Sequence, residues 1–245
     1  MNKKILPFIL PIIIIVLWAI VTMVLKLVPD YVIPSPVTVI TSGYDLVITG
    51  RLFLDTTDTL FKVISGLIIA SIVAIPCGLL MGWSKKLEEM TKIVVGVLRP
   101  IPPLAWIPFS ILWFGIGTVP AIFIIFMGCV FPILIYTIDG VKRTDKVLVE
   151  AGETLGANSY QTLTKVIFPS SIPTIVSGLK VAVGIALMCT VSAEMIASDK
   201  GLGHLILNAS QLFDTGATVI GMLAIGVIGL IFDYIFNKAQ NRIFW

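Results

Sequence analysis

The chain has 245 residues, of which 57% are hydrophobic and only 13% are charged, and its mean hydropathy is +1.04. An average soluble domain carries about a quarter of its residues as charged side chains, so this composition excludes a soluble globular protein. The formal net charge of +3 is too small and too scattered for a nucleic-acid-binding surface, which excludes nucleic acid as a partner.

Long uncharged stretches predict an all-α membrane protein with six transmembrane helices, because about 20 apolar residues in a helix cross the hydrocarbon core. Residues 100–138 carry no charge and would extend about 58 Å as one helix, which is too long for one crossing. The chain must therefore turn back near residues 115–120. The predicted spans cover about residues 5–25, 63–84, 93–114, 119–138, 173–197 and 215–232.

These spans divide the chain into five parts, and its basic residues indicate their orientation. The parts are the first span (1–28), an external segment with an interfacial helix over about 38–48 (29–60), spans two to four (61–138), a cytoplasmic loop (139–172), and spans five and six with the C-terminus (173–245). Basic residues collect on the side of the termini, which predicts that both termini are cytoplasmic. Those on that side are Lys3, Lys4, Lys85, Lys86, Lys92, Lys142, Arg143, Lys146, Lys165, Lys238 and Arg242, against Lys26, Arg51, Lys62 and Lys200 opposite.

No residue pattern indicates a metal or redox site. Cys77, Cys129 and Cys189 lie in apolar runs without a Cys-x-x-Cys spacing and are interpreted as small apolar residues. His204, the only histidine, stands near glycines and has no ligand partner at a suitable spacing, so it is interpreted as a residue of a short surface loop.

The cytoplasmic loop contains a first predicted amphipathic helix over about residues 144–155. Its apolar stripe consists of Val147, Leu148, Ala151 and Leu155. Gly156 is expected to end the helix, because glycine readily adopts the left-handed conformation that closes a helix.

A second short helix is expected directly afterwards, with Asn158 as its N-cap and Gln161 three positions later. We expect this helix to end at Phe168-Pro169. The exposed apolar faces need a lipid surface, a soluble partner or their own bundle to cover them. Glu150 and Glu153 occupy positions where a lipid-bound helix would carry basic residues, which favours a protein groove.

This loop resembles the EAA loop in the permease subunits of bacterial binding-protein-dependent ABC importers. The resemblance rests on Glu150-Ala151-Gly152, then Gly156, then Val166-Ile167-Phe168-Pro169, with Gly152 and Phe168 as departures from the pattern. The block from Arg99 to Gly117 resembles the branch that serves nitrate, sulfonate, taurine and bicarbonate. Ala193-Glu194-Met195-Ile196 followed by Gly201-Leu202-Gly203 matches that branch too.

The resemblance implies a six-helix permease subunit in the bacterial cytoplasmic membrane, surrounded by membrane lipid. It would work with a second permease copy, expected to be identical, with two ATP-binding cassette subunits and with an external solute-binding protein. ATP and Mg²⁺ would belong to the partner ATPase, because this chain has no G-x-x-x-x-G-K-[ST] loop, and no enzyme activity or cofactor is expected in it. The expected ATPase-coupling residues are Glu150, Ala151, Gly152, Leu155, Gly156 and Pro169.

Residues that could line a transport route lie in the third and fifth spans. Several prolines in the third span should break its helix, and broken backbone at membrane depth is tolerated where it borders a water-filled cavity or is buried by protein. A structural kink with interfacial tryptophans is the alternative. Glu194 near the outer end of the fifth span needs water or a partner. The pathway candidates are Pro102, Pro103, Trp106, Trp113 and Glu194.

The basic residues Arg99 and Lys180 are interpreted as reaching the cytoplasmic interface. The expected activity is inward movement of a small solute, anionic in the resembling branch, by alternating access. Alternatives are a permease for a vitamin-precursor pyrimidine, a secondary transporter without an ATPase, and a non-transporting scaffold. A secondary transporter would be expected to show paired intramembrane charges or inverted repeats, and the sequence shows neither.

Overall fold

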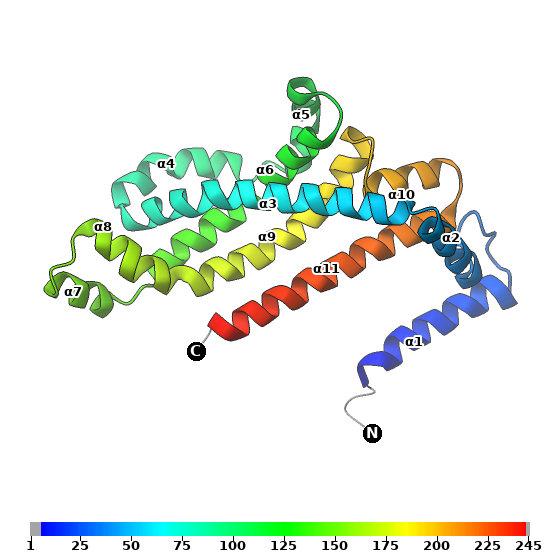
Figure 1. Cartoon of the computed structure of the whole chain (residues 1–245), viewed down its shortest axis with the longest axis horizontal. Coiled ribbons are helices and arrows are strands. Elements are labelled where there is room, and N and C mark those ends of the chain that lie inside the picture. The colour runs from blue at the N-terminus through cyan, green and yellow to red at the C-terminus, as the bar shows by residue number, and fades with distance from the viewer. Residues whose placement is uncertain (1–5, 244–245) are drawn as a thin grey trace.

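The computed structural model describes residues 6–243, and all regular structure in this range is helical (Figure 1). Lys3, Lys4 and the outermost residues of the first and last predicted parts lie outside this range. The helices are α1 (Leu6–Ala19), α2 (Pro36–Ile48), α3 (Arg51–Trp83), α4 (Lys85–Leu98), α5 (Ile107–Phe114), α6 (Thr118–Lys142), α7 (Lys146–Thr154), α8 (Ser159–Thr162), α9 (Phe168–Ala197), α10 (Leu202–Gln211) and α11 (Thr215–Ile243).

Helices α3, α6 and α9 pack side by side and form the core of the molecule (Figure 1). A stripe of small residues follows α3 at every fourth position, and it allows the backbone of α6 to approach closely. A Cβ added at Gly78 would lie 2.6 Å from Cβ of Thr137, so any side chain there would push the two helices apart. The stripe consists of Gly66, Ala70, Ala74, Gly78 and Gly82.

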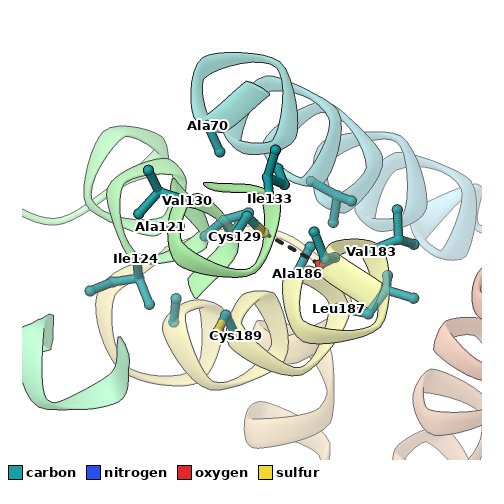
Figure 2. Close-up of a cluster of buried hydrophobic side chains, with 14 of the residues drawn as sticks. Ala70, Ala121, Ile124, Cys129, Val130, Ile133, Val183, Ala186, Leu187 and Cys189 are labelled. Atoms are coloured by element: carbon teal, nitrogen blue, oxygen red, sulfur yellow. Dashed lines mark hydrogen bonds between the residues drawn. The ribbon is translucent and has the colours of Figure 1, made fainter. Parts of the chain in front are cut away.

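The centre of this core is apolar and contains two of the three cysteines (Figure 2). Cys129 and Cys189 are buried and unbridged, and the Cys129 thiol donates to the carbonyl of Ala182 at 3.4 Å. Their interpretation as small apolar residues is confirmed, whereas Cys77 is exposed.

Helix α11 packs along α9 and α10, and α2 lies against its first turns. Helix α1 lies apart from the three core helices (Figure 1). It is joined to the segment before α2 by a hydrogen bond from Nε1 of Trp18 to the carbonyl of Pro34 at 2.9 Å. The interfacial helix predicted over residues 38–48 corresponds to α2, where the Ser35 hydroxyl accepts from the backbone N–H of Thr38 at 3.2 Å.

Among the described residues, four helices are long and apolar enough to cross a membrane: α3, α6, the continuous helix Ser159–Ala197, and α11. The pair α4 and α5 supplies a fifth span if its two halves are counted together. The second span differs from its predicted limits, because α3 already begins at Arg51, before the boundary placed at residue 61. Arg51, Asp55, Asp58 and Lys62 therefore belong to the helix itself.

The third span breaks as its prolines predict. Helices α4 and α5 are bent by 82° relative to each other, and the intervening residues include Pro100, Pro102 and Pro103. Each proline lacks a backbone donor and disfavours the helical conformation of the residue before it, so consecutive turns cannot stay hydrogen-bonded. The helix leading into the break begins at Lys85 rather than near residue 93.

Two local predictions were wrong. The second loop helix does not end at Phe168-Pro169, because α8 continues through a π-helical turn at Leu163–Ile167 into α9. The N–H of Phe168 bonds to the carbonyl of Leu163 in this wider turn, and Pro169 follows it directly, so the proline stands where the regular hydrogen-bond pattern is already interrupted. His204 is not in a loop but in α10, where its Nε2 lies 2.8 Å from Nδ2 of Asn208.

Candidate functional site

The helix pair α7–α8, residues 146–162, stands at one end of the bundle (Figure 1). The carboxylate of Asp145 caps α7 by accepting from the N–H of Val147 at 2.9 Å. The helix ends at Thr154, and Gly156 follows in the left-handed conformation with φ +81°. The predicted role of Gly156 in closing this helix is confirmed.

Helix α8 begins with the predicted capping box. The side chain of Asn158 accepts from the N–H of Gln161 at 2.8 Å, and the side chain of Gln161 accepts from the N–H of Asn158 at 2.9 Å. This reciprocal pair satisfies two donors that a helix start leaves free. The turn between the two helices therefore has a defined shape although it projects from the bundle.

The apolar stripe of the pair has no cover within the described chain. Val147 is 66% exposed, Leu155 is 88% exposed, and Tyr160 on α8 is 74% exposed. Only the opposite side of α7 is packed, where a Cβ at Gly152 would lie 3.4 Å from Cγ2 of Val166. The bundle itself thus leaves this stripe free for a partner.

The remaining coupling candidates divide into two places. Glu150 and Ala151 are exposed on α7, together with the stripe. Pro169 lies beyond the π-helical turn, within the helix that crosses the bundle. Because Ser159–Ala197 is one continuous helix, a displacement of α8 acts directly on α9.

At the opposite end of α9, Glu194 is fully buried and accepts hydrogen bonds from three residues on two helices, α3 and α10. The hydroxyl of Thr59 on α3 lies 2.9 and 3.0 Å from its two carboxylate oxygens. The N–H of Gly203 on α10 donates to Oε2 at 2.8 Å. The ammonium of Lys62 on α3 donates to Oε1 at 3.2 Å.

Lys62 is also fully buried, and its ammonium group is saturated. It pairs with Asp58 one turn earlier on α3, and it donates to the hydroxyl of Ser198 at 2.8 Å and to the carbonyl of Lys200 at 2.7 Å. The Lys62–Glu194 network, defined here as Asp58, Thr59, Lys62, Glu194 and residues 198–203, therefore ties α3, α9 and α10 together.

This network corrects two interpretations. No paired intramembrane charges were expected from the sequence, but Lys62 and Glu194 form a buried pair between α3 and α9. A lack of paired charges therefore cannot be used to reject a secondary transporter. Glu194 was also expected to line the route, yet it has no exposed surface and its carboxylate is enclosed by its partners. The structure assigns it to holding three helices together instead.

The break between α4 and α5 borders a cavity of about 350 Å³ between α6 and α9. Pro103 lines it, and Pro102 beside it is exposed. The lining residues are Arg99, Ile101, Pro103, Met127, Gly128, Phe131, Pro132, Ile135, Tyr136, Val181 and Ile185. Arg99, which was interpreted as reaching the cytoplasmic interface, lines this cavity. Lys180, given the same interpretation, pairs with Asp233 on α11 at 3.0 Å.

Trp106 and Trp113 belong to an aromatic cluster beside the break rather than to the cavity wall. Their rings lie 6.5 and 5.8 Å from that of Phe123 on α6, both edge-on. Trp106 is half-buried, and Trp113 is 54% exposed. The cluster holds α5 against α6, which fixes the geometry of the break.

Sequence reasoning missed Lys62, Thr59 and the N–H of Gly203 as partners of Glu194. One signal was available: Asp58 and Lys62 are four residues apart, the spacing of neighbours on a helix face. Within residues 6–243, no group of His, Cys, Asp and Glu side chains is arranged to hold a metal ion.

Known proteins agree with this architecture. A protein of Methanocaldococcus jannaschii described as an ABC transporter permease is 46% identical over 80% of this chain and 74% of its own length. A Bacillus subtilis protein described as an aliphatic sulfonates transport permease is 32% identical over 96% of this chain and 84% of its own. The bicarbonate transport system permease of Synechococcus elongatus is 33% identical over 74% of this chain and 66% of its own length.

The fold is that of a known transporter subunit. A chain of a methionine ABC transporter, crystallised in inward-facing conformations, superimposes with a TM-score of 0.73 at 17% identity, covering 81% of this chain and 98% of that one. Residues 66–244 match the family described as the binding-protein-dependent transport system inner membrane component. The chain therefore belongs to this family of inner-membrane permease subunits of binding-protein-dependent ABC transporters.

Proposed function

We propose that this permease imports a small anionic solute, of the sulfonate, taurine, nitrate or bicarbonate type, by alternating access. It would cross the bacterial cytoplasmic membrane six times, with both termini and the helix pair α7–α8 in the cytoplasm. The observation that carries the proposal is the exposed apolar helix pair, because it continues without interruption into the membrane-spanning helix α9.

Energy for transport has to reach this chain through a protein contact. A permease subunit of this family is not itself an enzyme and carries no cofactor; it implies an ATPase and a binding protein as partners. We assign α7–α8 as the surface that the ATPase covers, with Val147, Leu155 and Tyr160 as its apolar contacts. Nucleotide-driven closure of two such ATPase subunits would displace both helix pairs of a permease homodimer.

Alternating access further requires two packings of similar energy, each favoured by a different partner. The ATPase would bias one packing through α8 and α9, and the loaded binding protein would bias the other from outside. The 82° break between α4 and α5, with Pro102 and Pro103 at the cavity and Trp106 and Trp113 beside it, is the segment that we assign to the route. The route would bind the solute only weakly and briefly, because the external binding protein supplies the selective binding.

The substrate class rests on the relatives, whose descriptions name aliphatic sulfonates and bicarbonate. Both are small anions with several oxygen acceptors. A permease for a vitamin-precursor pyrimidine is the alternative within the same resemblance, and such a solute would be uncharged.

The proposal is tested with the permease, its ATPase and its binding protein reconstituted in proteoliposomes. Uptake of radiolabelled taurine, ethanesulfonate, nitrate and bicarbonate is compared with uptake of an uncharged aminopyrimidine. We expect uptake of at least one anion to require ATP, and to stop when a non-hydrolysable nucleotide replaces it. Import of the pyrimidine alone would contradict the substrate class, and import of any solute without ATP or the ATPase would contradict the mechanism.

A further inference from the structure

We infer that Arg99 is an anion-binding residue of the transport route, where its guanidinium contacts the oxygen atoms of the solute. The contact would take place in the 350 Å³ cavity at the break, with Tyr136 in the same wall. This inference rests on the proposed import of an anion and names the group in this chain that meets it.

Arg99 lies beside the middle of the bundle. The wall of the cavity includes Gly128 from the middle of α6, Tyr136 from its second half, and Val181 and Ile185 from the middle of α9. Helix α4 has 14 residues and extends about 21 Å from Lys85, and Arg99 follows its last residue. Arg99 is therefore well removed from the basic end of α4 and lies beside the apolar middle of α9, where a charge is costly unless it meets water or a counter-ion.

Arg99 has no side-chain partner among residues 6–243. Lys62 and Lys180, by contrast, each pair with a carboxylate. The guanidinium of Arg99 makes no ion pair and no side-chain hydrogen bond with any described residue, and Arg99 is exposed. Its five donors remain available for a ligand.

The lining of the cavity fits a small anion. Among the described residues that line it, Arg99 is the only one with a formal charge, and most of the others are apolar. Low-dielectric walls around a single charge focus its field on a small ion. A planar guanidinium binds two oxygens of a sulfonate, carboxylate or bicarbonate side by side. One such contact, without a second cation, permits weak binding and rapid release.

The charge of the cavity can be measured without any transport. Ile135, a half-buried residue of the cavity wall, is changed to cysteine in a Cys77→Ser background within the assembled transporter in lipid nanodiscs. The thiol is labelled with anionic methanethiosulfonate ethylsulfonate and with its cationic trimethylammonium analogue, each rate being normalised to that of a free thiol. The ratio of the anionic to the cationic rate then reports the local potential.

We expect Arg99→Gln to lower this ratio roughly fivefold to tenfold, because a unit charge at cavity range attracts one reagent and repels the other. Arg99→Lys should retain most of the ratio, since it keeps the charge. The matched control is Lys92→Gln, which removes one charge from α4 outside the cavity and should leave the ratio unchanged. Equal ratios for Arg99→Gln and Lys92→Gln would overturn the inference.

Uptake in the reconstituted transporter provides the second readout. For an anion that the unmodified transporter imports, Arg99→Gln should reduce uptake roughly tenfold, Arg99→Lys less, and Lys92→Gln little. If the unmodified transporter imports no anion, the proposed function fails, whereas the labelling ratio still decides whether Arg99 attracts anions. If it imports an anion and Arg99→Gln imports it equally well, the inference fails and the proposed function stands.

Discussion

The two ends of α9 are built in opposite ways. At the α10 end, Glu194 and Lys62 have no exposed surface, and every polar atom of the pair has partners from α3 or the 198–203 loop. At the α7–α8 end, Leu155 and Tyr160 are largely exposed, and nothing within residues 6–243 covers them.

This difference teaches how one helix can be anchored and driven at the same time. A buried charge pair is tolerated only in one geometry, since any displacement leaves charges unpaired in a low-dielectric interior. The exposed apolar stripe is not held in one position by contacts within the bundle, and only a partner can bury it. We therefore expect α9, α3 and α10 to move as one unit when α7–α8 is displaced.

The largest expected effect comes from breaking the anchored end. Glu194→Ala leaves the ammonium of Lys62 buried with only Asp58 as an anionic partner and should destabilise the protein by about 3–5 kcal/mol. Thermal unfolding of the purified permease measures this loss. Ser192→Ala is the control, because Ser192 is a half-buried neighbour on the same helix whose hydroxyl donates to the carbonyl of Met188 in its own helix. Equal unfolding temperatures for the two variants would show that the network does not anchor α9.

A companion variant sharpens the same test. Replacing Lys62 by Met together with Glu194→Gln removes both charges while retaining much of the side-chain volume. It should recover part of the stability that Glu194→Ala loses, because no charge remains fully buried; Asp58 loses its partner, but its side chain is 23% exposed and can be hydrated. A double variant less stable than Glu194→Ala would mean that packing, rather than charge pairing, holds this end together.

The second effect concerns the driven end and should appear in transport instead of stability. Gly156 has φ +81°, so a valine there costs at least about 1–2 kcal/mol in that backbone conformation. This cost lowers the population of the turn conformation that docks on the ATPase roughly 5-fold to 30-fold. No atom lies within 4 Å of an added Cβ, so the bundle should remain folded. ATP-driven uptake in proteoliposomes checks this prediction.

Gly152→Ala is the matched control for Gly156→Val. Gly152 lies in helix α7, where alanine is favoured over glycine by about 0.5–1 kcal/mol, and its added Cβ would only touch Val166. We expect uptake and ATPase coupling close to those of the unmodified protein. Normal uptake by Gly156→Val would show that the conformation of this turn is not needed for coupling to the ATPase.

The smallest effect is expected at an exposed ion pair near the driven end. Lys142 on α6 pairs with Glu88 on α4 at 2.5 Å, and both side chains are more than a third exposed. Water and salt screen such a pair, so Glu88→Gln should cost less than about 1 kcal/mol and less still at high ionic strength. Unfolding temperatures at low and high salt measure it. A loss of stability as large as that of Glu194→Ala would contradict the expectation that only the buried α10 end of α9 depends strongly on a charge pair.

Local sequence signals predicted the features that depend on a few neighbouring residues. Gly156 and the Asn158–Gln161 capping box define the α7–α8 turn because backbone conformation and capping are local. The prolines near residue 102 predicted the break for the same reason. Pro169 misled the prediction, because the π-helical turn that accommodates it has no simple sequence signature.

The sequence by itself determined the membrane environment, the positions of most spans and the amphipathic helix pair, because hydropathy and periodicity act over one helix at a time. Only the tertiary structure decided which charges meet. Lys62 and Glu194 are 132 positions apart, and the packing of α3 against α9 brings them together, whereas the same packing leaves Arg99 without a carboxylate partner among the described residues. Pairing across helices depends on their rotation and depth in the bundle, which no stretch of one helix specifies.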